Sequence, residues 1–303
     1  MLRRQAAEGF WTDWQLPPGS SSVWTTAYVG RKLAELSGHG DLGDRLRGAA
    51  EWLLARRFID GGWGYDGAVG SDADSTSQAL LMFAACGVPA PADAYEHLLG
   101  YQQADGGFAT YRPDVMPSSW TVSHPDVTPV AVLALATRLP VAHPAVRRGI
   151  AAARARRTRE GLWHSFWWDS FLYGTEANLA MLRAVGEPVS ALPALASAQP
   201  GGAFETALLL SCWANVTTGA YCGPIDALVE RLLQLQDADG GWPSAPILRL
   251  TRRDCYAPWD ASEAGPLFAD PNRLFTSATV LAALAEAGAA RGRQARSGRR
   301  ALR

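Results

Sequence analysis

One motif recurs along the whole chain and constrains its fold most: a glycine turn followed by an aromatic residue. Its five copies begin 39 to 55 residues apart, a spacing typical of helical repeats. They lie at 61–63, 106–108, 161–163, 201–204 and 240–242. Before each copy the apolar residues have helical spacing, and after it a polar loop leads into a more continuously apolar segment. The sequence therefore predicts a series of helix pairs.

The two segments of each pair differ in character. The first is amphipathic and predicts an outer helix, with arginine and glutamate on one side, as in Arg45, Glu51 and Arg56. The second is rich in Ala, Leu, Val and Thr on nearly every face, which predicts a helix buried on all sides. Six such apolar segments occur, at 23–36, 76–86, 128–139, 175–185, 204–214 and 275–287.

Six outer helices around six inner ones predict an all-α fold, an (α/α)6 barrel or toroid of six helix-pair repeats. The outer helix of the first pair is the weakest element, because only residues 1–10 are available for it. An open solenoid is the alternative, because stacking of repeats does not by itself demand closure. We expect residues 1–288 to form a single barrel domain and residues 289–303 a basic tail without regular structure.

Composition narrows the function classes. The 303 residues carry a net charge of −1, so no overall field attracts nucleic acid. The arginine-rich tail is interpreted as solvated, with weak association with a membrane surface as the alternative. No apolar run reaches membrane-spanning length and no signal peptide is visible, which predicts a cytoplasmic protein. The four cysteines form no CxxC pair and indicate free thiols: Cys86, Cys212, Cys222 and Cys255.

The turn at 236–242 has the pattern Q-x3-G-x-W, and related turns begin at Arg57, Gln102 and Arg157. These turns resemble the QW repeats of squalene–hopene and oxidosqualene cyclases. Three further segments sharpen the resemblance and occur in the family's order. They are DADST at 72–76, SHPDVT at 123–128 and GLWHSFWWDSFLYGT at 161–175. The similarity spans nearly all of residues 10–288, as a single barrel of the acid-motif (β) type.

The resemblance implies a class II terpene cyclase, an isomerase that begins by protonating a linear polyprenyl or prenylated substrate. It would be a lyase if diphosphate were lost. Asp74 matches the family's general acid, Asp72 its supporting carboxylate, and Ser75 replaces the final Asp of D-x-D-D. The family's supporting histidine is replaced by Val130, and His124 is the nearby substitute.

The residues themselves support a protonated carboxyl at this motif. Asp72 and Asp74 are close in sequence, and two neighbouring carboxyls cannot both ionise cheaply, so the pKa of one rises. Burial raises it further, by several units at most, whereas a helix N-terminus opposes it by less than about one unit. Each Asp, and also Asp126, has an ordinary alternative as a helix N-cap. For DADST we favour the acid.

A carbocation formed in the cavity would be stabilised by aromatic faces. The family resemblance assigns substrate-binding positions to seven residues. They are Trp24, Tyr65, Trp120, His124, Trp167, Tyr173 and Phe275. For each of them, ordinary core packing is the alternative. Trp63, Trp163 and Trp242 are interpreted as residues that fix turns.

A lone barrel suggests a sesqui- or diterpenoid or a prenylated aromatic as the hydrophobic isoprenoid substrate. The bifunctional relatives carry a second barrel, so a homo-oligomer or a partner that closes the barrel mouth is compatible with the sequence. In the loop at 243–273, Arg249, Arg252 and Arg253 are interpreted as surface residues, with closure of the mouth or diphosphate binding as alternatives.

Other functions fit less well. A prenyltransferase β subunit needs zinc ligands in its later repeats, but all histidines fall within the first 164 residues. No DDxxD run exists for an ionisation-initiated synthase, and the inner segments carry little charge for a glycosidase. We therefore expect no metal or cofactor, with Mg²⁺ entering only through a diphosphate substrate. A non-catalytic isoprenoid- or partner-binding barrel with a degenerate acid motif remains the alternative.

Overall fold

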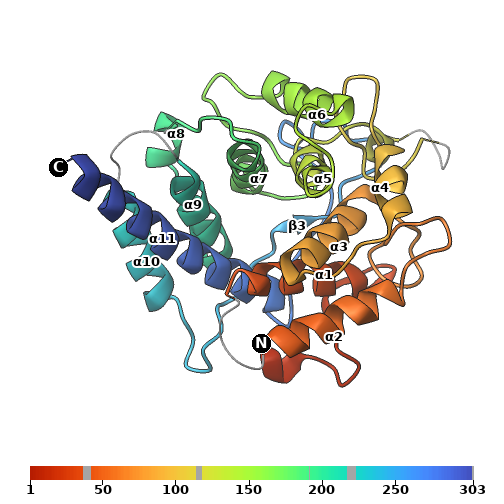
Figure 1. Ribbon diagram of the computed structural model, residues 1–303, viewed down its shortest axis with the longest axis horizontal. Coiled ribbons are helices and arrows are strands. Elements are labelled where there is room, and N and C mark those ends of the chain that lie inside the picture. Colours follow the sequence, from red (N-terminus) through yellow and green to blue (C-terminus); the bar gives the residue numbers. More distant parts are fainter. Residues whose placement is uncertain (37–41, 114–117, 191, 217–222, 302–303) are drawn as a thin grey trace.

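The computed structural model describes residues 1–36, 42–113, 118–190, 192–216 and 223–301. Six inner helices form a closed ring in which each packs against the next and the last packs against the first (Figure 1). They are α1 (Val23–Ala34), α3 (Ala73–Cys86), α5 (Val127–Ala136), α7 (Phe171–Ala184), α9 (Ala203–Asn215) and α11 (Leu274–Ala301). The predicted α/α barrel is confirmed, and the contact between α11 and α1 excludes the open solenoid.

The outer layer is less regular than the inner ring. Its helices are α2 (Leu42–Leu54), α4 (Ala92–Leu99), α6 (Pro144–Ala155), α8 (Pro193–Ala196) and α10 (Gly223–Gln234). Among the described residues before α1, the only helical element is a 3-10 turn at Leu2–Arg4, so six complete helix pairs are not confirmed. This is the position that the short N-terminal segment made weakest.

The three glycine turns that carry a tryptophan are built from the same hydrogen bonds. Trp63 shows the pattern: its indole Nε1–H donates to the carbonyl of Leu53 in the outer helix, at 2.7 Å. Its backbone N–H donates to Thr76 Oγ1 of the next inner helix, at 3.0 Å. Trp163 and Trp242 repeat both bonds, to Ala153 and Thr175 and to Leu232 and Ser277. The predicted role of these tryptophans in fixing turns agrees with these bonds.

The glutamine or arginine that begins each turn also has a defined partner. Arg57 donates to the carbonyl of Gly61 at 2.9 Å, and Gln236 donates to that of Gly240 at 2.9 Å. Both glycines have positive φ, +101° and +82°, a conformation in which a side chain would be strained. Arginine and glutamine can both make this bond, because each has a side-chain N–H donor.

The loops that precede the inner helices cover one end of the ring. Two short antiparallel pairs lie there, β1 (Asp13–Leu16) with β2 (Gly19–Ser21), and β3 (Leu248–Arg249) with β4 (Leu267–Phe268). In Figure 1 the ring is viewed roughly along its axis, and β3 lies near its centre. Backbone bonds tie the 243–273 loop to its neighbours, from Arg249 to Trp167 and from Ser119 to Arg253.

The C-terminal helix is longer than expected. α11 continues to Ala301, past residue 288, in a stretch rich in alanine and arginine, both strong helix formers. The division into a barrel domain and a tail stays a prediction. Cys86, Cys212 and Cys255 are free thiols, whereas Cys222 lies outside the described residues. In the described part of the chain, no helix is both long and apolar enough to cross a membrane.

Candidate active site

A cavity of about 380 Å³ opens at the covered end of the ring, at the beginnings of α1 and α3. It brings together seven of the predicted site residues, namely Asp72, Asp74, Ser75, Trp24, Tyr65, Trp120 and Trp167. The other lining residues are Leu16, Pro17, Pro18, Val69, Thr110, Tyr111, Trp168, Leu248, Arg249, Leu250 and Arg253. The wall is mostly apolar, with the acid motif on one side.

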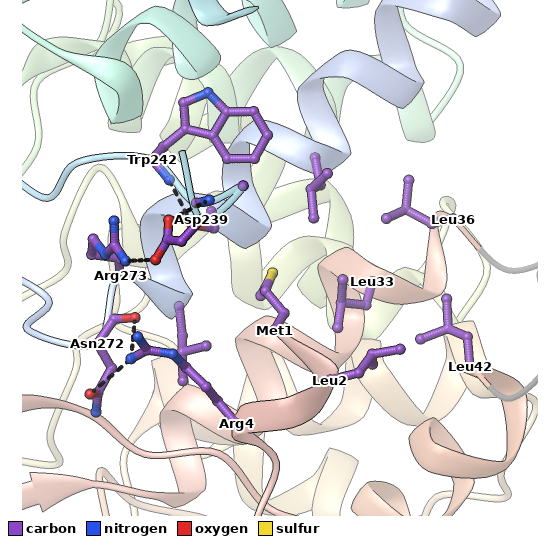
Figure 2. Close-up of a pocket in the computed structure, with 15 residues that line it drawn as sticks. Met1, Leu2, Arg4, Leu33, Leu36, Leu42, Asp239, Trp242, Asn272 and Arg273 are labelled. Atoms are coloured by element: carbon purple, nitrogen blue, oxygen red, sulfur yellow. Dashed lines mark hydrogen bonds and ion pairs between the residues drawn. The ribbon is translucent and has the colours of Figure 1, made fainter. Parts of the chain in front are cut away.

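A second cavity, of about 340 Å³, lies on the outer side of the barrel beside the N-terminal 3-10 turn. Figure 2 shows Met1, Leu2 and Leu33 on one wall, facing Trp242, and the Arg273–Asp239 ion pair at its edge. None of the predicted site residues lines it. The chemistry predicted from the sequence therefore belongs to the first cavity.

Asp72 caps the first turn of α3. Its backbone is extended, and its Oδ1 accepts the Ser75 N–H at 2.7 Å. Its Oδ2 accepts the Ser75 hydroxyl at 2.7 Å. Ser75 thus holds Asp72 through two bonds. The charge of Asp74 and its backbone N–H also act on the Asp72 carboxyl.

Asp74 lies within the first turn of α3 and lines the cavity. Its Oδ2 accepts the indole N–H of Trp24, which begins α1, at 2.8 Å. The pKa of Asp74 is raised to about 6, first by burial and then by the charge of Asp126, and the hydrogen bond from Trp24 opposes this rise. Burial and then the charge of Asp74 raise the pKa of Asp72 to about 7. The pair therefore keeps a proton near neutral pH.

The hydrogen bonds indicate which carboxyl can give up that proton. The order of the two pKa values favours Asp72, but both Asp72 oxygens act as acceptors for Ser75, which suits an ionised carboxylate. Asp74 accepts the Trp24 indole through Oδ2, has the Gln78 side chain as a second polar neighbour, and lines the cavity. The geometry favours Asp74 as the donor.

Asp126 is a third buried carboxyl that the sequence did not assign to the site. We interpreted it as a routine N-cap of α5, but its side chain makes no capping bond. Its Oδ2 instead accepts the backbone N–H groups of Phe166 and Trp167, at 2.8 and 2.9 Å. Burial raises the pKa of Asp126 to about 6. Asp126 holds the backbone of residues 166–167, and its negative charge acts on Asp74.

His124 lies behind the cavity wall. Its Nε2 faces the carbonyl of Ser119 at 2.7 Å, so it carries the proton, and its Nδ1 accepts the hydroxyl of Thr110 at 2.8 Å. Thr110 in turn accepts the indole N–H of Trp167 at 2.8 Å. Burial lowers the pKa of His124 to about 3. The predictions that His124 contacts substrate or supports the acid are wrong, and it positions Trp167.

The aromatic residues form two layers. Trp24, Tyr65, Trp120 and Trp167 line the cavity as predicted, and Trp168 joins them. Tyr173 and Phe275 do not line it. They lie in the second layer, where the Tyr173 and Phe275 rings stack on Trp168 with centroids 4.2 and 5.3 Å away. The sequence signal for Trp168 was the Trp-Trp pair in 161–175, of which the family resemblance marked only the first.

Arg249 and Arg253 lie at the cavity wall. The prediction that the loop arginines are surface residues is wrong for Arg249. Arg249 is only 7% exposed and forms an ion pair with Asp169. The guanidinium of Arg253 lies 4.8 Å from the centre of the Trp120 ring. Arg252 remains at the surface, paired with Asp254. Within the described ranges, no cluster of His, Cys, Asp or Glu is arranged to hold a metal ion.

Known proteins resemble this chain over different lengths. No family model matches it. A probable squalene–hopene cyclase of Sinorhizobium fredii is 27% identical over 209 residues, which cover 56% of this chain and 32% of that protein. The chain therefore spans about a third of the curated relative's length.

Solved structures match over nearly the whole chain. Type II terpene cyclase MstE from Scytonema has a TM-score of 0.83 and 26% identity, covering 95% of both chains. A variant of that cyclase is known in complex with its substrate, geranylgeranyl dihydroxybenzoate. A protein from Actinoplanes also has a TM-score of 0.83 and 26% identity, covering 95% of this chain and 96% of its own.

The closed ring and the buried carboxyls at an aromatic cavity define an α/α barrel with an acid site at one end. The fold is that of the terpene cyclases. The chain is therefore similar to the class II terpene cyclases, over nearly its whole length to MstE and over part of its length to a squalene–hopene cyclase.

Proposed function

We propose that this protein is a class II terpene cyclase, which protonates and cyclises a prenylated substrate with Asp74 as the general acid. The observation that carries the proposal is the placement of Asp74. Its carboxyl, whose pKa is raised to about 6 by burial, lies in a cavity walled by Trp24, Trp167 and Trp168.

The reaction balances without a cofactor. The Asp74 O–H bond breaks as its proton binds the terminal alkene carbon, whose π electrons form the new C–H bond. The cation left on the adjacent carbon is attacked by the next alkene, and loss of a proton ends the sequence, so the product is an isomer of the substrate. Each aromatic face that meets the cation stabilises it by about 0.5–2 kcal/mol. The apolar walls keep water from quenching it.

We further propose that the substrate carries a polar or anionic head group. Arg253 lies at the wall of the cavity with its guanidinium over Trp120, within reach of a group at that end of the cavity. The substrate of MstE supports a prenylated aromatic acid as the first compound to test. A diphosphate head is the second, and its loss during the reaction would make the enzyme a lyase.

The experiment is an assay of the purified chain with geranylgeranyl dihydroxybenzoate and with geranylgeranyl diphosphate, in buffer containing EDTA. We expect a cyclised product of unchanged mass from one of them, detected by liquid chromatography with mass spectrometry. Tight binding of both compounds without any product would contradict the proposal and favour a non-catalytic isoprenoid-binding barrel. Ser75 in place of a third carboxyl is the observation that keeps this alternative.

A further inference from the structure

We propose that Trp24 is a positioning residue for the acid: its indole N–H holds Asp74 Oδ2 as an acceptor and so places the transferable proton on Oδ1. The inference rests on the proposed function. Trp24 Nε1 and Asp74 Oδ2 are 2.8 Å apart, and the two residues belong to adjacent inner helices, α1 and α3. The side chain thus has two separate features, an aromatic face at the cavity and a donor directed at the acid.

The chemistry of the two groups determines the position of the proton. An indole N–H can only donate, so the oxygen that it faces must supply a lone pair. A protonated carboxyl has one O–H and one oxygen that is purely an acceptor, and the bond is strongest when the acceptor faces the indole. The proton therefore resides on the other oxygen, Oδ1.

The indole is held firmly enough to impose this choice. Trp24 is 6% exposed and packs against Phe275 and Trp168, with ring centroids 5.0 and 6.2 Å away. It also packs against Tyr65 at 6.3 Å. Rings on several sides leave the N–H one direction, toward α3. Ser75 is engaged with Asp72, and the indole of Trp24 is the donor at Asp74 Oδ2.

The bond also alters the strength of the acid. It stabilises the ionised form of Asp74, and removal of the N–H should raise the pKa of this carboxyl. The other groups that act on Asp74 stay in place in such a variant. They are Asp72 at the N-cap of α3, Gln78 in α3, Arg31 in α1, Asp126 at the N-cap of α5, Tyr173 in α7, and Tyr111 in the loop between α4 and α5.

The first test is Trp24→Phe, which keeps an aromatic face and loses the donor. We expect kcat to fall about tenfold or more, as for loss of a hydrogen bond to a charged group. KM should change by less than about threefold, because the apolar wall is largely kept. The limb at which activity falls with rising pH should move to higher pH, because the less acidic carboxyl keeps its proton longer.

A second variant guards against a packing defect. Benzothienylalanine at position 24 has the size and shape of tryptophan with sulfur in place of the N–H, and it should reproduce the loss of kcat and the shift of the limb. The matched control is Trp242→Phe, which loses an indole bond to the carbonyl of Leu232, outside the acid cavity. It should lower the melting temperature and leave the pH profile unchanged.

A direct titration separates this inference from the proposed function. The pKa of Asp74 can be followed by NMR of ¹³C-labelled carboxyl groups, with Asp74→Asn identifying the signal, and needs no turnover. A higher pKa in both position-24 variants supports the inference even if the tested compounds are not substrates. An unchanged pKa, or a rise in KM with an unshifted pH profile, would overturn it.

Discussion

The beginnings of α3 and α5 look alike in sequence and differ in what their aspartates do. Asp72 caps its own helix and leaves Asp74 facing the cavity. Asp126 stands at the equivalent place before α5, yet it binds the backbone of the neighbouring 166–167 segment. The same residue type at the same helix end can therefore serve the helix, the substrate cavity or the adjoining repeat. The role of each aspartate depends on the backbone groups that the neighbouring loop places beside it.

The largest effect should come from Asp74→Asn. An amide has no acidic proton to give, so we expect cyclisation to fall by about a thousandfold or more, at the upper end of what general acid catalysis contributes. The fold should persist, because Asp74 is not the cap. Product formation and thermal melting measure the two parts. A variant that cyclises normally but melts several degrees lower would make Asp74 structural.

Asp126→Ala should act mainly on stability. It leaves two backbone N–H groups without their acceptor beneath the cavity, at a cost of about 2–4 kcal/mol, which urea unfolding would detect. It also removes a negative charge that raises the pKa of Asp74, so the activity limb should move to lower pH. Asp126→Asn, whose amide oxygen still accepts, is the matched control for the backbone bonds. Equal stability of wild type and Asp126→Ala would refute the role given to this residue.

Asp72→Asn should slow cyclisation less than Asp74→Asn does. Asparagine is as good an N-cap as aspartate, so the helix end is preserved. The variant removes a carboxyl that, once ionised above about pH 7, opposes ionisation of Asp74, so the protonated fraction of Asp74 falls there. Steady-state kinetics across pH 5 to about 8 would rank the variants. Complete loss of activity in a folded Asp72→Asn protein would instead assign the proton to Asp72.

A smaller effect is expected on how the free energy of unfolding depends on pH. The folded pKa of Asp72, about 7, lies above its ordinary value of 3.8, so its protonated form favours folding. That contribution is complete below about pH 4 and is lost as pH rises through 7. Asp72→Asn lacks the ionisation. Its melting temperature relative to wild type should therefore be higher at pH 8 than at pH 5, and a constant difference would contradict the raised pKa.

The turns and the ring could be predicted from sequence because they depend on local rules. The glycine conformations and the turn tryptophans repeat with each helix pair, so one turn predicts the others. The errors lie where distant segments meet. The direction of the Asp126 side chain depends on residues 166–167, and His124 serves Thr110 rather than the acid. Trp168 reaches the cavity because the Tyr173 and Phe275 rings lie behind it. No spacing within one repeat encodes these contacts.

Isotope transfer tests the central claim most directly. The Asp74 carboxyl exchanges its proton with solvent, so a reaction run in D2O should deliver deuterium from this residue to the alkene carbon that is protonated first. We predict a cyclised product one mass unit heavier than in H2O, labelled at that carbon, and no such product from Asp74→Asn. A cyclised product without deuterium, or a labelled product formed equally well by the variant, would contradict the account.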